Sequence, residues 1–428
     1  MDPYRPPEFP PDARLPGAPD PWTPSSPPGW RDGPPYLMTE MIEAEPALAE
    51  RLLARLWRAD GPAFRVADAI REAARTGGPI VTTGCGTSEH GAMATAAILS
   101  DAMRRAGLAG VAGVAGLAGV AGLAGVAGVA GVAGVAGVAG RATSVQAFEA
   151  ALAPQEGGLL IAVSHGGGTW ATIEAMRAAR ARGTTTALVT VSGRSPAAEL
   201  ADIVVETDEQ DQGWCHTVGY LSPIVAAASI GGALTRMPIE ASTVRDLLAE
   251  GVSRRDAAGT IAAALAPTSH ILVVGSGADR PAAWELALKI EEACYLPSTA
   301  RDLESMLHGH LPATDESTGM VVILTDPERR PDRWDRAQGL FLAAARVGIR
   351  TAAIVGSGLS WALPPKLTPA GRILVPETPD LPAPVASLIG TAAPLQLLTE
   401  RLARARRTNP DRLRRDDPAY REAAAAYE

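Results

Sequence analysis

The chain alternates short apolar runs, glycine-rich turns and amphipathic helical patterns. Residues 271–274 are apolar and mostly β-branched, and they run into Gly275-Ser-Gly and then into a helical pattern that opens with a proline. This order is typical of a buried parallel strand, a tight turn and a helix N-terminus. Residues 79–91 and 158–176 repeat it. Strands and helices that alternate in this way predict an α/β fold with parallel, doubly wound sheets and right-handed crossovers.

Charged residues share one face of the predicted helix that follows Gly275. Glu285, Lys289 and Glu292 stand at positions i, i+4 and i+7, while apolar residues fill the other faces. An ion pair on a solvated face would explain them and would contribute only roughly 0.3 kcal/mol. The alternative is a functional cluster, because a short loop that contains His308-Gly follows in the same part of the chain.

Two of the glycine turns carry hydroxyl side chains where a helix is expected to begin. Residues 85–88 read Cys-Gly-Thr-Ser, and residues 164–169 read Ser-His-Gly-Gly-Gly-Thr. Free amides and hydroxyls at a helix N-terminus suit a phosphate monoester or a sugar hydroxyl. Such turns can equally cap an ordinary strand-to-helix connection, so they do not by themselves decide between binding and structure.

Together these motifs resemble the isomerase domains of glutamine–fructose-6-phosphate aminotransferases, which belong to the sugar isomerase (SIS) family. Residues 283–292 match the pattern A-x-E-x-A-L-K-x-x-E of those domains, and His308-Gly matches their H-G loop at the same separation. Residues 85–88 match C-G-T-S, and residues 164–169 correspond to S-Q-S-G-E-T. The resemblance begins at about Tyr36 and extends into the C-terminal tail.

The resemblance implies two tandem SIS lobes, each a doubly wound parallel five-stranded sheet flanked by helices. We expect the first lobe at 78–250 and the second at 251–406, with an N-terminal helical segment at 36–77 and a C-terminal tail at 407–428. Residues 1–35 are rich in proline and should form a disordered arm. The second residue is Asp where the aminotransferases have the cysteine of a glutamine amidohydrolase domain, so that domain is expected to be absent.

The resemblance also assigns roles to single residues. Glu292 would move the proton between C1 and C2 of an open-chain sugar, and His308 would help to open the sugar ring. Lys289 and Glu285 would complete the catalytic group. The residues expected to bind the substrate or its phosphate are Gly86, Thr87, Ser88, Ser164, His165, Gly167, Thr169 and Thr217. In this family the H-G loop completes the site of the neighbouring subunit, so a homodimer is expected, with His308 contributed across the interface.

The sequence departs from the family pattern at two places. His165, Gly166 and Gly168 replace glutamine, serine and glutamate in the second turn, which removes one phosphate-binding hydroxyl. A neutral His165 could still donate one hydrogen bond, and the glycines still expose their amides. The tail has no lysine where the aminotransferases have one. Arg414 or Arg415 could bind a substrate anion there but could not act as a base.

Residues 108–140 form eleven tandem Leu/Val-Ala-Gly triplets without proline or charge. Each glycine lowers helix propensity by about 1 kcal/mol relative to alanine, so a stable regular helix is not expected. We interpret the triplets as a low-complexity insertion in a loop between a helix and a strand.

The composition narrows the class of protein. With 428 residues, 46% of them hydrophobic, the chain can bury an ample core, and its net charge of −8 argues against a nucleic-acid partner. The three cysteines show no disulfide or metal spacing, and the N-terminus lacks a secretory signal, so a cytoplasmic protein without a membrane partner is expected. We expect no cofactor and no metal site, since His308 and His310 lack further ligands nearby. His90 and His270 are interpreted as structural.

We therefore predict an enzyme whose small-molecule partner is a hexose or hexosamine phosphate, acting through an enediol or enolamine as an isomerase, deaminase or aminotransferase. A sugar-phosphate sensor without turnover is the alternative, and the altered second turn and the tail without lysine favour it. A third hypothesis is a structural paralogue that binds a partner through the triplet insertion. The sequence does not identify the sugar.

Overall fold

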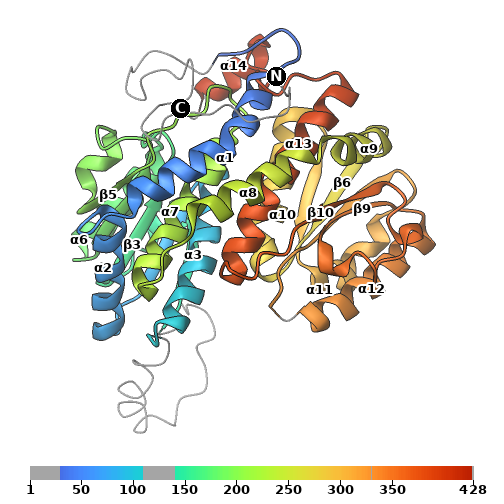
Figure 1. Ribbon diagram of the computed structural model, residues 1–428. Coiled ribbons are helices and arrows are strands. Elements are labelled where there is room, and N and C mark those ends of the chain that lie inside the picture. Colours follow the sequence, from blue (N-terminus) through green and yellow to red (C-terminus); the bar gives the residue numbers. More distant parts are fainter. Residues whose placement is uncertain (1–28, 109–139, 329, 427–428) are drawn as a thin grey trace, which may run out of the picture.

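Two parallel β-sheets, separated by a layer of helices, make up the computed structural model (Figure 1). The structure describes residues 29–108, 140–328 and 330–426. Residues 1–28 of the expected arm, and 109–139 of the triplet insertion, lie outside the described residues.

The first sheet has five parallel strands in the order β2-β1-β3-β4-β5. Ile80 of β1 pairs with Ala142 of β2 on one side and with Leu159 of β3 on the other. The strand order reverses at β1, and ligands of such sheets bind beyond the carboxyl ends of the strands at this point. The strands are β1 (Ile80–Gly84), β2 (Ala142–Gln146), β3 (Leu159–Val163), β4 (Thr185–Thr190) and β5 (Ile203–Glu206). The helices of this half are α1 (Leu37–Leu56), α2 (Pro62–Thr76), α3 (Thr87–Arg105), α5 (Ala147–Leu152), α6 (Trp170–Ala181) and α7 (Val218–Thr235).

The second sheet is also parallel and five-stranded, in the order β10-β9-β8-β6-β7. The expected α/β fold with two five-stranded lobes is thereby confirmed. The strands of the second sheet are β6 (His270–Val274), β7 (Ser298–Arg301), β8 (Thr318–Leu324), β9 (Arg350–Gly356) and β10 (Gly371–Val375). The helices of this half are α8 (Ala241–Ser253), α9 (Arg255–Leu265), α10 (Arg280–Cys294), the short α11 (Leu303–Ser305), α12 (Arg330–Val347), α13 (Ala383–Arg406) and α14 (Pro418–Ala425).

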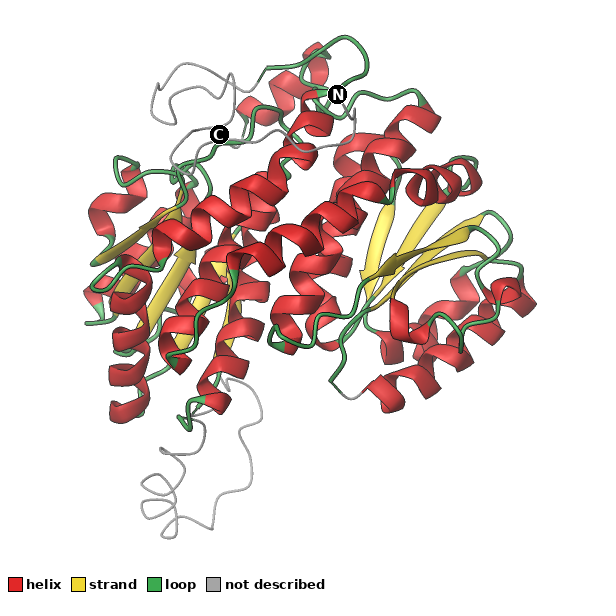
Figure 2. Cartoon of the chain, in the orientation of Figure 1, coloured by secondary structure: helices red, strands yellow, loops and turns green. Residues whose placement is uncertain are grey.

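One hydrophobic core spans both lobes. It contains Ile42 of α1, Ile224 of α7, Ile290 of α10 and Leu398 of α13, all fully buried. Figure 2 shows these helices between the two sheets. Because burial of apolar surface is the main driving force of folding, the shared core fixes the lobes against each other.

Helix α7 is apolar on all its faces. By length and composition it could cross a membrane, but 94% of it is buried inside the protein, where it packs against α3, α1 and α2. A helix that is hydrophobic all round is expected at such a central position of a large core.

The glycine turn after β6 is filled by side chains of its own lobe. The Asp279 carboxylate accepts hydrogen bonds from the backbone N–H groups of Thr325 (2.9 Å) and Asp326 (3.1 Å). The Asp326 carboxylate accepts a bond from the backbone N–H of Ala278 (3.1 Å) and pairs with Arg333. Internal carboxylates thus take the place that an anionic ligand would take in an open turn.

The C-terminal tail is fastened to the start of α1. The buried Asp411 carboxylate accepts hydrogen bonds from the backbone N–H groups of Arg31 (3.2 Å), Leu37 (2.9 Å) and Met38 (3.2 Å). Two of these donors, the N–H groups of Leu37 and Met38, stand at the start of α1, where a helix offers its N–H groups no partner four residues earlier. Residues 29–35, expected to belong to a disordered arm, are therefore held against the tail.

We predict that Asp411→Ala lowers the free energy of unfolding by about 1–3 kcal/mol, because buried donors lose their acceptor. Urea titration checks the loss. Asp68→Ala, which removes a carboxylate whose side chain is 75% exposed, should change stability by less than about 0.5 kcal/mol. Equal losses in the two variants would show that Asp411 does not tie the tail to α1.

Stability should also depend on pH through Asp279. Burial raises the pKa of Asp279 to about 6, although bonds from Thr325 and Asp326 oppose the shift. Because the pKa in the unfolded chain is lower, about 3.9, the folded protein holds a proton that the unfolded chain loses between these values. Stability from this group therefore falls as pH rises from about 4 to 6, by about 3 kcal/mol, and then stays level.

The variant Asp279→Asn cannot ionise, so its urea unfolding free energy should lack this decline between pH 4 and 6. The difference between wild type and variant, measured at several pH values, isolates Asp279 from the other titrating groups. Parallel curves across that range would contradict the prediction.

Candidate active site

Helix α10 brings buried charges to the boundary between the lobes. It packs against α13, α3 and β7, and Glu285 and Lys289 are both fully buried. Taking an ion out of water costs several kcal/mol unless the ion is paired and hydrogen-bonded. The arrangement of this helix is therefore governed by the partners that its charges find.

A continuous chain of contacts joins the first glycine turn to Glu292. The Glu285 carboxylate lies 2.7 Å from His90 Nδ1 and 3.3 Å from Thr87 Oγ1, both on the first turn of α3. Lys289 Nζ lies 3.6 Å from Glu285 Oε1 and 2.5 Å from Glu292 Oε2. The three charged residues expected on one helix face thus form one ionic cluster, which reaches into the first lobe.

The cluster keeps its members charged. Burial alone would lower the pKa of Lys289, but Glu292 and Glu285 together raise it far above the ordinary value. Burial would raise the pKa of Glu285, and Lys289 with the bonds from His90 and Thr87 lowers it instead. Lys289 is therefore a fixed cation at neutral pH and cannot serve as a base there.

Glu292 is the accessible member of the cluster. Its side chain is 22% exposed, against 1% for Lys289 and Glu285. It lines a cavity of about 400 Å³ together with the end of α10, the following loop and the tail. Its Oε2 also lies 3.7 Å from the thiol of Cys215, which is buried. A carboxylate with one side held and one side open has the geometry of a general base.

The loop that carries Cys215 is held by α1 and by the start of α7. Arg51 and Arg55 of α1 pair with Glu209 and Asp208, each at 2.5 Å. Farther along the loop, Asp211 accepts hydrogen bonds from the backbone N–H groups at the N-terminus of α7. Burial raises the pKa of Cys215 well above its ordinary value, so its neutral thiol can donate a hydrogen bond to Glu292.

The two hydroxyl-bearing turns lie next to each other beyond β1 and β3. The backbone N–H of His165 donates to Ser88 Oγ at 3.4 Å and so joins them. Gly167 has φ +64°, and a Cβ on it would lie 2.3 Å from Ser195 Oγ, so glycine is needed there. The hydroxyl of Ser164 is buried, and no described residue bonds to it. The turns therefore keep an unused donor where strand ends of a parallel sheet meet a helix start.

Two residues expected to bind substrate point inward. His165 Nε2 accepts a hydrogen bond from the backbone N–H of Asp211 (3.0 Å), and burial lowers the pKa of the ring despite Asp211. Its side chain is thus a neutral acceptor inside the lobe, whereas the sequence predicted a bond from the ring to a phosphate. Thr217 is fully buried and its hydroxyl donates to Asp211 (3.2 Å). It stands at the start of α7, and its side chain bonds within the protein, whereas the sequence predicted a contact with substrate.

His308 lies apart from the cluster within its own chain. Its side chain is 72% exposed and its Nε2 lies 2.7 Å from Glu304 of the same loop. In that loop His308 and Gly309 leave helical geometry, with Gly309 at φ +115°. The loop therefore projects an imidazole outward, and no contact joins it to Glu292 among the described residues.

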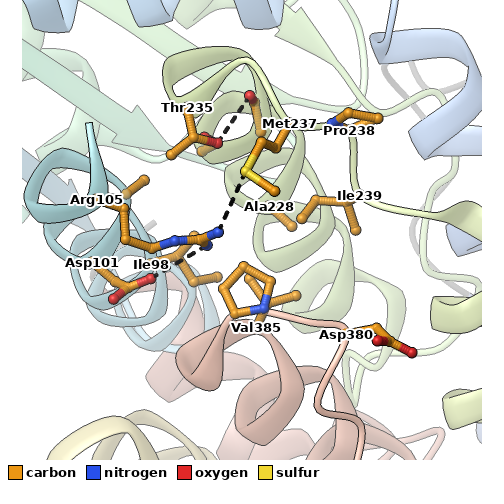
Figure 3. A pocket seen from close by; sticks show the side chains of 14 residues that line it. Ile98, Asp101, Arg105, Ala228, Thr235, Met237, Pro238, Ile239, Asp380 and Val385 are labelled. Atoms are coloured by element: carbon orange, nitrogen blue, oxygen red, sulfur yellow. Dashed lines mark hydrogen bonds and ion pairs between the residues drawn. The ribbon is translucent and has the colours of Figure 1, made fainter.

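Two further cavities differ from the one at Glu292. One of about 510 Å³ runs between α3, β2 and the start of α10, with Trp284 in its wall and the Arg280 guanidinium 4.4 Å from the Trp284 ring. Trp170, the other tryptophan that follows a turn, is exposed. The cavity in Figure 3, where Arg105 reaches Met237, holds only about 40 Å³. That volume suits about one water molecule and is too small for a sugar.

Sequence reasoning missed two members of the site. His90 lies three residues after Thr87 on α3, and this helical spacing could have signalled a shared face. Nothing in the sequence signalled Cys215, because its contact with Glu292 depends on how the lobes dock. No group of three or more His, Cys, Asp or Glu side chains within 29–108, 140–328 and 330–426 is arranged to hold a metal ion.

No family model matches the chain, but several curated proteins are similar to it in sequence. It is 30% identical over 183 residues to a glutamine–fructose-6-phosphate aminotransferase (isomerizing) of Zymomonas mobilis, covering 40% of this chain and 30% of that protein. It is 27% identical over 272 residues to the enzyme of the same name from Pyrobaculum aerophilum, covering 60% of this chain and 42% of that protein. The chain thus spans less than half of the length of these relatives.

Solved structures give the same picture for the fold. The C-terminal domain of glucosamine–fructose-6-phosphate aminotransferase from Francisella tularensis has a TM-score of 0.70 at 17% identity, covering 90% of this chain and 99% of that chain. Tagatose-6-phosphate ketose/aldose isomerase from Escherichia coli has a TM-score of 0.61 at 18% identity, covering 88% and 95%. The chain is therefore similar in sequence to part of glutamine–fructose-6-phosphate aminotransferase (isomerizing), and it has the two-lobed fold of the C-terminal domain of glucosamine–fructose-6-phosphate aminotransferase.

Proposed function

We propose that the chain is a phosphosugar enzyme that moves a proton between C1 and C2 of an open-chain hexose or hexosamine phosphate. The observation that carries this proposal is the half-open position of Glu292, held by Lys289 at 2.5 Å on one side and facing a cavity of about 400 Å³ on the other. A structural ion pair would need no exposed carboxylate at the rim of a cavity.

The phosphate would bind at the two hydroxyl-bearing turns. Their helix N-termini favour an anion, and the hydroxyl groups of Ser88 and Ser164 can donate to phosphate oxygens. The buried Ser164 hydroxyl without a partner supports this assignment. The residues that we assign to phosphate and substrate binding are Gly86, Thr87, Ser88, Ser164, Gly167 and Thr169, with the backbone of His165.

Glu292 would act as the base. Its carboxylate takes the proton from the carbon next to the carbonyl group while the carbonyl oxygen gains a proton, which gives an enediol, or an enolamine when the substrate carries an amine. The proton then returns from the carboxyl group to the neighbouring carbon, while the hydroxyl group on the first carbon loses its proton and becomes the new carbonyl group. One carbon is oxidised as its neighbour is reduced, so the step balances without an external electron acceptor. Lys289 holds Glu292 in place, and Glu285 balances the charge of Lys289.

The names of the related proteins support this class of reaction. They include an isomerizing aminotransferase, a ketose/aldose isomerase and the glucosamine-6-phosphate deaminase from Thermotoga maritima, whose TM-score is 0.59 at 14% identity, covering 88% of this chain and 97% of that chain. We therefore propose an isomerase, deaminase or aminotransferase type of activity in the cytoplasm.

A second subunit would complete the site. His308 is exposed and remote from Glu292 within its own chain, which fits a loop that opens the sugar ring in the neighbouring pocket of a homodimer.

A sensor without turnover remains the second candidate function. Glycines stand at 166 and 168, where the related turns have serine and glutamate, and the tail at 407–428 has no lysine. A chain that binds hexose phosphates but converts none of them would favour this reading over catalysis.

We predict that Glu292→Gln loses turnover of its hexose phosphate by 10²–10⁴-fold, roughly the usual contribution of a general base, and still binds the substrate within a few fold. Steady-state rates with fructose 6-phosphate and glucosamine 6-phosphate, and thermal shift for binding, separate the two effects. Glu291→Gln is the matched control, because Glu291 lines the same cavity. A fully active Glu292→Gln enzyme would put the base elsewhere.

The shared site makes a second prediction. Glu292→Gln and His308→Ala chains should each be inactive alone, and co-expression should restore up to roughly half of the wild-type rate per heterodimer, because one of its two pockets has both groups intact. The control is the rate of each variant expressed alone, in which no dimer has an intact pocket. Sedimentation as a monomer, or no recovery in a mixture shown to exchange subunits, would refute the shared site.

A further inference from the structure

The C-terminal tail forms one wall of the cavity at Glu292. Leu413, Arg414 and Tyr420 of the tail line it opposite Glu292 and Tyr295 at the end of α10. Figure 1 shows α14 at the same end of the molecule as the start of α1. The cavity therefore lies at the C-terminal end of α10, and the buried Glu285 does not line it.

Arg414 is held rigidly in this wall. Its guanidinium lies 4.3 Å from the ring centre of Tyr295 and 4.8 Å from that of Tyr420, and it also donates a hydrogen bond to the Tyr420 hydroxyl. Its backbone N–H donates to the Tyr295 hydroxyl at 3.0 Å. Two aromatic faces fix the plane of the group and leave donors at its edge, so little entropy is lost when a ligand binds.

No carboxylate among the described residues forms an ion pair with Arg414. The neighbouring arginines differ: Arg412 pairs with Asp416 and Asp32, and Arg415 stacks on Trp214, with 3.8 Å from its guanidinium to the ring centre. A preorganised guanidinium edge in a cavity suits an oxyanion, because its fork matches carboxylate and phosphate oxygens.

We infer that Arg414 determines specificity, and that the substrate is a phosphosugar with a second anionic group at the end of the sugar where Glu292 acts. This inference rests on the proposed function, in which the first phosphate lies at the hydroxyl-bearing turns and the reacting carbons lie at Glu292. A group attached at that end extends into the part of the cavity that Arg414 lines. Because arginine stays protonated, Arg414 cannot act as a base at this position of the tail. We therefore assign it a role in binding the substrate.

Three acyclic ligands that differ only at C1 test the inference. Glucitol 6-phosphate has a hydroxymethyl group at C1, 6-phosphogluconate has a carboxylate, and glucitol 1,6-bisphosphate has a phosphate. Calorimetric titration of the full chain should show that at least one of the two doubly charged ligands binds about tenfold more tightly than glucitol 6-phosphate, as expected for one charge-assisted contact. The preferred ligand identifies the second anion as carboxylate or phosphate.

Arg414→Gln should abolish that preference and leave the affinity for glucitol 6-phosphate unchanged. Arg421→Gln changes the net charge by the same amount at an exposed tail residue that does not line the cavity, and it should keep the preference. Equal affinity of the wild type for all three ligands, or a preference that survives in Arg414→Gln, would overturn the role of Arg414. If none of the three ligands binds, the proposed phosphosugar function fails as well.

Discussion

The position of Lys289 between Glu285 and Glu292 is the constraint on which the rest of the site depends. A buried ammonium group is tolerated only with close partners, and here both partners lie on its own helix. Glu285 needs partners in turn and finds them in Thr87 and His90 of the other lobe. The buried charges of α10 therefore hold the first glycine turn close to Glu292. The hydrophobic core that both lobes share holds the lobes together in the same arrangement.

Both lobes are built from the same strand-turn-helix units, but the side chains at their glycine turns differ. In the second lobe the turn after β6 is closed by Asp279 and Asp326, with Arg333 as the counter-charge. In the first lobe the corresponding turns keep hydroxyls and amides, and Ser164 has no described partner. In the second lobe, internal carboxylates thus bind backbone amides at the turn, whereas in the first lobe Glu285 accepts a hydrogen bond from the hydroxyl of Thr87. This difference supports our proposal that the anion binds in the first lobe.

Much of this arrangement could be read from the sequence, since it follows from local patterns. Apolar runs before glycine turns predicted the parallel strands, and the i, i+4, i+7 spacing predicted the common face of Glu285, Lys289 and Glu292. The direction of the His165 side chain could not be read, because it depends on Asp211, which lies 46 positions later and is held by the start of α7. The contact of Cys215 with Glu292 depends likewise on the docking of two lobes. Local sequence patterns determine the helices and strands. Contacts with segments far along the chain determine what each side chain of the site does.

Helix α1 links the tail, which lines the cavity at Glu292, to the loop whose Cys215 contacts Glu292. Near its start, its backbone N–H groups donate hydrogen bonds to Asp411 of the tail. Near its end, Arg51 and Arg55 form ion pairs with the loop that carries Cys215. Because a helix is stiff, α1 couples the position of the tail to the position of the loop that contacts Glu292. A displacement of the tail would therefore either carry this loop with it or break one of the two sets of contacts.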